Sequence, residues 1–245
     1  MVSTRGSATD TGTAAPESST PAKRAAGAKA APAKRAKRGN GTSLNGERAR
    51  DREVIETAVQ IFWEKGYASA SVQDVADALG MLKGSLYYYI DSKESLLRKI
   101  FEDSHSEIVA LTEFVTEVDG SAMERLERFL RDYAMWTLTH LERAGLYSRE
   151  WRYAGPTLKA TLTEQQTYYD THLRDLIVAG QAEGALDPQV DPRRASAFIW
   201  AAYTGLPDWF RPSGRHKAED VASIYVDLAL RAAGRYSSGS PYSTS

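Results

Sequence analysis

The chain has 245 residues, of which 42% are hydrophobic, a formal net charge of −1 and no cysteine. This composition allows a buried core but excludes disulfides, thiolate metal sites and cysteine nucleophiles. No apolar run has the length of a membrane span, no apolar segment follows the basic N-terminal residues as in a secretory signal, and the histidines lack the paired spacing of metal ligands. We therefore expect a cytoplasmic protein that uses no membrane, no metal and no cofactor.

Residues 1–46 differ in charge from the rest of the chain. Eight basic residues stand against two acidic ones there, a balance of +6 that leaves −7 for the remaining residues. Large apolar side chains are almost absent, so this segment cannot offset its ordering entropy and should be a disordered basic tail. Its Ala-Lys-Arg repeats resemble the tails of DNA-compacting proteins, which add sequence-independent phosphate contacts. A plain solubilising extension is the alternative.

Apolar periodicity then predicts a helix over residues 47–66, which Gly66 ends, followed by two short helices joined by a tight turn. The first of the two spans residues 71–79. Ser71 is its N-cap, and Gly80 provides the backbone freedom for the turn into the second. This arrangement is a helix-turn-helix.

The second short helix has two inward positions, Leu86 and Ile90, because they lie four residues apart. Its other side chains project from a helix that is too short to bury them. Three consecutive tyrosines are wasteful on a solvated surface but fit one that meets phosphates and base edges. A helix-turn-helix presents its recognition helix to the major groove in this way.

Residues 47–101 resemble the DNA-binding domain of the TetR/AcrR-type transcriptional regulators. The resemblance follows the Lys-Gly-Tyr of residues 65–67, the Gly-Ser-Leu-Tyr-Tyr-Tyr-Ile of residues 84–90, and the Ser-Lys-Glu of residues 92–94, which opens a long helix. It implies a helix-turn-helix DNA-binding domain over residues 47–92 and double-stranded DNA as a partner.

The positions within this motif suggest how DNA is contacted. Met81 and Leu82 stand where the family more often has small polar residues, so the operator sequence stays open. The expected contacts are Ser71 and Lys93 to phosphates, Tyr87 and Tyr89 through their hydroxyls to phosphates, Lys83, Ser85 and Tyr88 to base edges, and Gly84 through close backbone approach.

Helical periodicity continues through residues 93–234 without strand-like alternation. We therefore expect an all-α chain of about nine helices, with a three-helix DNA-binding head, a larger body that binds a ligand and forms a dimer, and a frayed C-terminus over residues 235–245. Helices are expected over residues 92–118, 126–140, 144–153, 157–183, 193–210 and 217–233.

The last two expected helices have faces that stay apolar over many turns. In TetR-like proteins the corresponding helices pack against their twofold mates, and a dimer sets the half-site spacing. The resemblance thus implies a homodimer on a palindromic operator, whereas a role in the monomer core alone is the other interpretation. The faces comprise Ala195, Phe198, Ile199, Ala202, Tyr203 and Leu206 on one helix, and Val221, Ile224, Tyr225 and Leu228 on the other.

Most large aromatic residues lie in the body, where they are typical of a ligand cavity or, alternatively, of plain core. Residues 149–153 and 209–214 resemble one branch of the family, the repressors of steroid-ring and fatty-acid breakdown, whose effectors are acyl-CoA thioesters. The candidate ligand-binding residues are Tyr133, Trp136, Arg149, Trp151, Arg152, Tyr153, Tyr169, His172, Phe198 and Tyr203.

The sequence thus predicts a sequence-specific transcriptional repressor that a small-molecule effector, with acyl-CoA as one class, releases from DNA. A drug-efflux regulator of the same fold and a general nucleoid-associated protein are the alternatives. An enzyme is disfavoured, because no Gly-rich phosphate loop, metal constellation or nucleophile elbow is visible.

Overall fold

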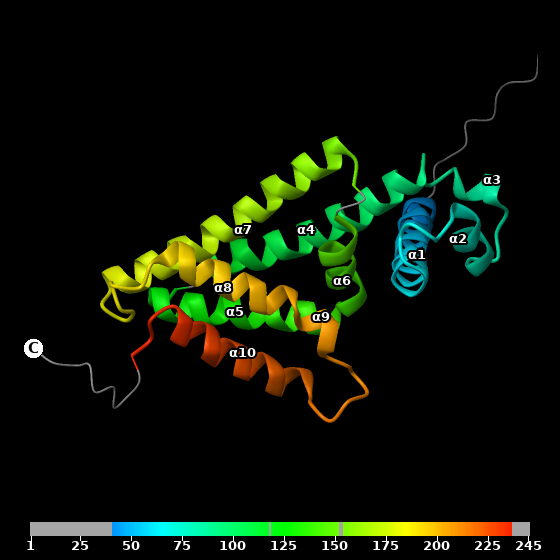
Figure 1. Cartoon of the computed structure of the whole chain (residues 1–245). Coiled ribbons are helices and arrows are strands. Elements are labelled where there is room, and N and C mark those ends of the chain that lie inside the picture. The colour runs from blue at the N-terminus through cyan, green and yellow to red at the C-terminus, as the bar shows by residue number, and fades with distance from the viewer. Residues whose placement is uncertain (1–40, 118, 152–153, 237–245) are drawn as a thin grey trace, which may run out of the picture. The chain divides into compact units, whose positions relative to one another are not determined.

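A computed structural model of the chain describes residues 41–117, 119–151 and 154–236. Helices account for almost all regular structure in these ranges, so the expected all-α fold is confirmed (Figure 1). The helices are α1 Gly41–Lys65, α2 Val72–Ala78, α3 Lys83–Leu86, α4 Lys93–Glu117, α5 Ala122–Thr139, α6 Leu141–Glu150, α7 Pro156–Ala182, α8 Pro192–Thr204, α9 Leu206–Trp209 and α10 Ala218–Ala232. We call α1–α3 the head and α4–α10 the body.

The head folds largely as its local sequence dictates. Ser71 and Asp74 form a reciprocal capping box at the start of α2, and Gly66 and Gly80 end α1 and α2 with φ angles of 74° and 64°. Leu86 is fully buried, as predicted from its spacing. The disordered tail was expected to reach residue 46, but α1 already begins at Gly41. The rest of the expected tail, residues 1–40, lies outside the described residues.

The second short helix ends earlier than its apolar spacing suggested. After Leu86 the amides of Tyr88 and Tyr89 bond to carbonyls three residues back, at 3.2 and 2.9 Å, so the tyrosine run forms a tightened turn. This turn brings Ile90 back into the head core and leads directly into α4.

One helix expected in the body is really two. The apolar pattern continued from residue 193 to residue 210, but the chain breaks at Gly205 into α8 and α9. Pro207 lies in the first turn of α9, where its missing amide costs nothing, whereas inside a continuous helix it would remove a hydrogen bond. Periodicity alone could not reveal this break, because Tyr203 before it and Leu206 after it are both buried.

Helices α4, α6 and α7 each contribute buried residues to the core of the head and to the core of the body. In the body, α10 packs against α5 and α8, and α7 packs against α5 and α8 as well (Figure 1). The head core, built around Phe62, Leu86 and Ile100, continues through Leu146 and Leu162. Within the described residues, no helix has both the length and the apolar character that a membrane crossing requires.

Candidate functional site

The recognition element consists of α2, the turn at Gly80, and α3 with the tyrosine turn. Lys83 and Ser85 are exposed, as is the glycine between them. The three tyrosines differ from one another, because Tyr88 is 92% exposed and Tyr87 46%, whereas Tyr89 packs partly against the head core. The turn after α3 therefore directs Tyr88 outward.

The two predicted phosphate contacts at the flanks are engaged within the protein. The Ser71 hydroxyl and amide both donate to Asp74, whose carboxylate also accepts a 2.5 Å hydrogen bond from Lys65. These hydrogen bonds hold the pKa of Asp74 well below its usual range, and the bond from Lys65 has the largest effect. The Lys93 ammonium lies 4.3 Å from the centre of the Tyr67 ring. Ser71 and Lys93 would therefore exchange internal partners for phosphates, and their DNA contacts stay predictions.

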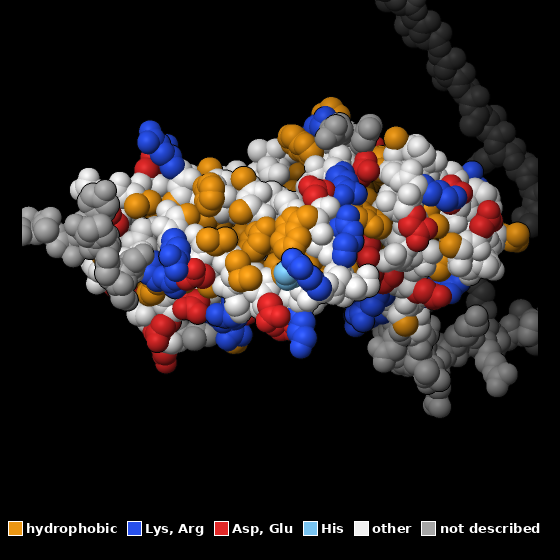
Figure 2. All heavy atoms as spheres, turned by 60° about the horizontal axis from the view of Figure 1, so that its bottom comes forward, with side chains coloured by type: hydrophobic (Ala, Val, Ile, Leu, Met, Phe, Trp, Pro, Cys, Tyr) orange, Lys and Arg blue, Asp and Glu red, His pale blue; other side chains and the backbone are white. Residues whose placement is uncertain are grey.

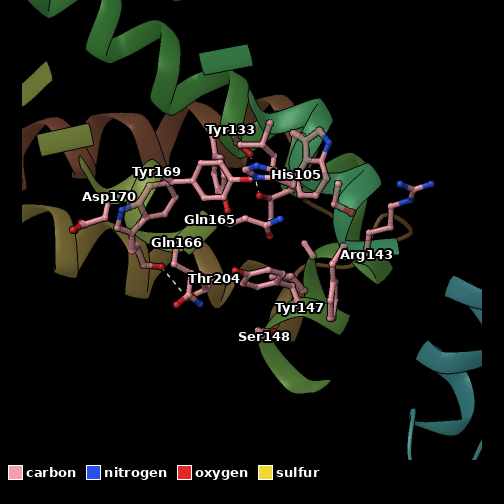
Figure 3. Close-up of a pocket in the computed structure, with 18 residues that line it drawn as sticks. His105, Tyr133, Arg143, Tyr147, Ser148, Gln165, Gln166, Tyr169, Asp170 and Thr204 are labelled. Atoms are coloured by element: carbon pink, nitrogen blue, oxygen red, sulfur yellow. Dashed lines mark hydrogen bonds between the residues drawn. The ribbon is translucent and has the colours of Figure 1, made fainter. Parts of the chain in front are cut away.

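The body encloses a cavity of about 240 Å³ (Figure 3). Its wall comes from six helices, α4, α5, α6, α7, α8 and α9, so residues from position 101 to position 207 converge on it. The lining residues are Phe101, Ser104, His105, Ile108, Tyr133, Trp136, Thr137, Arg143, Ala144, Tyr147, Ser148, Gln165, Gln166, Tyr169, Asp170, Trp200, Thr204 and Pro207.

The polar groups of this cavity are mostly uncharged. The Tyr169 hydroxyl is hydrogen-bonded to Nδ1 of His105, and the Tyr147 hydroxyl donates to the Leu162 carbonyl at 3.2 Å. Burial lowers the pKa of His105 and raises that of Tyr147 to about 12, which keeps both side chains neutral near pH 7. The side chain of Gln165 is buried, and in the view of Figure 3 it lies between Tyr169 and Tyr147. Such a wall suits a ligand with apolar bulk and a few carbonyl or hydroxyl oxygens.

The structure brings three of the ten predicted ligand residues to the cavity, namely Tyr133, Trp136 and Tyr169. Tyr203 is buried beside Tyr133, with 6.0 Å between the ring centroids, but it does not line the cavity.

The remaining candidates lie elsewhere. Arg149 forms a 2.8 Å ion pair with Asp208, while Trp151 and Phe198 are 41% and 62% exposed. His172 packs against the Phe129 ring, and residues 152–153 lie outside the described residues. Their ligand roles stay untested predictions, and the cavity described above does not include them.

Sequence reasoning did not single out His105, Tyr147, Gln165 or Trp200 as ligand residues, although all four line the cavity. Gln165 had a readable signal. It occupies the apolar stripe of α7 between Leu162 and Tyr169, at spacings of three and four residues, where an apolar side chain is the norm. A polar residue at a core position indicates either a buried hydrogen bond or a cavity.

Helix α6 contacts both the cavity and the head. Tyr147 and Ser148 line the cavity, while Arg143 directs its guanidinium away from the cavity centre (Figure 3) and bonds to Glu56 of α1. The Arg143 side chain is only 5% exposed, and the carboxylates of Asp103 and Glu107 lie 3.9 Å from it. A ligand that moves α6 would therefore disturb contacts with α1.

Gly145 and Arg149 add two more contacts between α6 and α1. A Cβ at Gly145 would overlap the Trp63 ring, so only glycine allows this close approach. The Arg149 guanidinium lies over the Trp63 ring, 4.2 Å from its centre. Helices α6 and α1 are thus in close contact at this junction.

Comparison with known proteins identifies the class. Residues 54–100 match the model of the bacterial regulatory proteins of the tetR family, and residues 119–233 match that of the tetracyclin repressor-like C-terminal domain. A TetR-family regulator of known structure, PfmR from Thermus thermophilus, is 31% identical over 73% of this chain and 97% of its own, with a TM-score of 0.67. The chain belongs to the TetR family, and it is a ligand-responsive, sequence-specific DNA-binding transcriptional regulator.

Two further proteins resemble this chain, one in sequence and one in fold. The HTH-type transcriptional repressor KstR2 of Rhodococcus jostii (strain RHA1) is 26% identical over 188 residues, which cover 76% of this chain and 92% of KstR2. The structure of AibR in complex with isovaleryl coenzyme A and operator DNA superposes with a TM-score of 0.68 and 23% identity, covering 74% of this chain and 98% of AibR. The latter similarity concerns the fold.

Proposed function

We propose that the protein is a homodimeric repressor whose two heads, over residues 47–92, read the halves of a palindromic operator. The body, over residues 93–234, would bind the effector and form the dimer. The observation that supports a dimer is an apolar surface over α8 and α10, where Phe198, Ile224 and Leu228 are 62%, 56% and 54% exposed. Figure 2 shows hydrophobic side chains gathered on the face that α10 presents. A contiguous patch of this kind is typical of an interface rather than of a solvated surface.

The effector that fits the cavity best is an acyl-CoA thioester. The single observation that supports this class is a cavity with six aromatic side chains and neutral hydrogen-bonding groups, which suits an acyl chain or ring and its carbonyl oxygen. The volume of 240 Å³ falls below the range of about 300–1,000 Å³ that encloses a whole drug-sized ligand. The cavity would therefore hold the acyl part, with the nucleotide outside. The names of the relatives support the class, since AibR was solved with an acyl-CoA.

Release from DNA would follow through α6. Because Arg143, Ala144, Tyr147 and Ser148 of α6 all line the cavity, a ligand that enlarges the cavity pushes this helix against α1. The ligand shifts the equilibrium only by its preference for the state that does not bind DNA, and a full reversal needs about 5.5 kcal/mol.

Thermal denaturation with a panel of CoA thioesters, the matching free acids and aromatic cations tests the effector class. A thioester should raise the melting temperature and release operator DNA, because it binds only the folded protein. Gln165→Leu should weaken both effects, whereas Val178→Ala, which alters an exposed residue of the same helix outside the cavity, should leave them intact. If only the aromatic cations stabilise the protein, it is a drug-efflux regulator and not a repressor that responds to an acyl-CoA.

Competition with random DNA tests sequence-specific repression against general nucleoid association. A repressor should prefer its selected site by a factor of roughly a thousand or more at physiological salt. Equal binding to random fragments would favour the nucleoid-associated alternative. Deletion of residues 1–40 separates the two contributions, because all eight basic residues of the tail lie there and the head is left intact.

A further inference from the structure

The recognition element carries an apolar side chain that the described fold does not use. Leu82 precedes α3 and is 80% exposed, and among the large hydrophobic residues of the described ranges only Tyr88 is more exposed. Leu82 and Tyr88 both belong to the recognition element. The most exposed apolar groups on the dimer surface reach only 62%. An exposed leucine side chain does not stabilise the free protein, because only its transfer out of water would lower the free energy.

The neighbouring residue shows that the exposure is specific to Leu82. Met81 packs partly against the head core, and its sulfur accepts a 3.8 Å contact from Arg50 of α1. Leu82 occupies the N-cap position of α3 in an extended conformation, with φ −69° and ψ 140°. Its side chain makes no capping hydrogen bond there, whereas serine, threonine, aspartate or asparagine at an N-cap contributes about 1 kcal/mol. The chain thus forgoes helix stability at this position.

We infer that Leu82 determines operator specificity by contacting the C5 methyl group of a thymine in the major groove. The residues at the start of a recognition helix are those that meet base edges, and an apolar side chain distinguishes thymine from the other bases by its methyl group. Lys83, which follows directly, and the nearby Ser85 are exposed on the same element and supply the polar contacts that orient it. This inference rests on the proposed reading of DNA by α3.

The test replaces each thymidine of the selected operator, one at a time, by deoxyuridine, which removes only the methyl group. At one position in each half-site the wild-type protein should lose about fourfold in affinity, the effect of one methyl-sized apolar contact. Leu82→Ala and Leu82→Ser should bind the thymidine and deoxyuridine operators equally well. A purely structural role of Leu82 would change both affinities alike and would keep the fourfold ratio.

The controls keep this test decisive. Leu82→Ser should fold at least as well as the wild type, because serine can cap α3, so a loss of discrimination cannot come from unfolding. Leu82→Met keeps an apolar side chain and should keep the discrimination. A selected operator in which no thymine is sensitive to its methyl group, or a sensitivity that persists in Leu82→Ala, would overturn the assignment. The lack of any selected operator would instead overturn the proposed sequence-specific function.

Discussion

The recognition element and the cavity use aromatic side chains in opposite ways. Tyr88 is 92% exposed and makes no contribution to the head core, whereas Tyr169 of the cavity is 7% exposed and packs against Ile108 and Trp136. A DNA-contacting surface must keep its side chains accessible before the partner arrives. A ligand cavity must bury them, so its residues serve the core and the site together. Substitutions of the exposed residues of the recognition element should therefore change binding alone, and those of the cavity residues should change binding and stability together.

The largest expected effect separates binding from stability within the head. Tyr88→Ala should lower discrimination between the operator and random DNA by about 1–3 kcal/mol, the magnitude of one good base contact, and leave the unfolding free energy within about 0.5 kcal/mol. Tyr89→Ala is the matched control, because Tyr89 packs against the head core and its removal should lower stability. Fluorescence titration with both DNAs and urea denaturation measure the two quantities. A stability loss in Tyr88→Ala would break the comparison.

The next effect concerns the junction between head and body. Glu56→Ala removes the carboxylate that bonds to the buried Arg143 and should lower the unfolding free energy by about 1–3 kcal/mol. Arg143→Met should cost less, because it leaves behind only carboxylates that are about half exposed. Glu53→Ala, which breaks an exposed ion pair on the same helix, serves as control and should change stability by less than about 1 kcal/mol. Equal losses of unfolding free energy in Glu56→Ala and Glu53→Ala would show that the bond between Glu56 and Arg143 does not stabilise the junction between head and body.

Two tyrosines of the body should respond with opposite signs. The Tyr203 hydroxyl is buried without a hydrogen-bond partner among the described residues, so Tyr203→Phe should raise the unfolding free energy by about 1 kcal/mol. Tyr169→Phe loses the bond to His105 and should lower it by about the same amount. Chemical denaturation of both variants measures the difference. A destabilised Tyr203→Phe would indicate a partner for that hydroxyl, such as a buried water.

A smaller effect is expected from the phosphate contact assigned to Lys93. Lys93→Ala should weaken binding to all DNA sequences alike and reduce the slope of log affinity against log salt by about 0.9. The loss should be modest, because the ammonium leaves the Tyr67 ring when it contacts DNA. Lys217→Ala, a substitution of an exposed lysine at the start of α10, should leave the slope unchanged. An unchanged slope in Lys93→Ala would assign this lysine to the head structure alone.

The smallest effect is the pH dependence of the body. Burial lowers the pKa of His105 and His172 below the ordinary 6.5, so the unfolded chain binds protons in a range where the folded protein does not. Their contribution to stability is therefore complete above pH 6.5 and is lost as the pH falls below it. Asp74, Glu124 and Asp227 have lowered pKa values and titrate at more acidic pH.

Urea denaturation between about pH 7.5 and 5.5 isolates the histidine contribution, because the carboxylates stay ionised over this range. The unfolding free energy should decline toward the acidic end, and replacement of both His105 and His172 by glutamine should flatten the decline. The same decline in the double variant would show that other groups carry the proton linkage.

The capping, turn and core positions of the head could be predicted from the sequence, because they depend on near neighbours in the chain. The capping box joins residues three apart, the turn needs only the backbone freedom of Gly80, and the inward position of Leu86 follows from helical spacing. The direction of Tyr88 against Tyr89 was beyond such rules. It depends on the tightened turn that returns Ile90 to the core before α4 begins.

The body shows what the sequence by itself determined and what it left to tertiary structure. Composition and periodicity determined an all-helical body rich in aromatic residues, and the head motif determined the family. Only the packing of six helices decided that Tyr133, Trp136 and Tyr169 share a cavity with His105 and Gln165, while Phe198 faces outward. Helical spacing fixes which residues share one face, but the rotation of each helix against its neighbours depends on side chains distant in the sequence. A cavity is the space that such packing leaves, so no single segment of the chain encodes it.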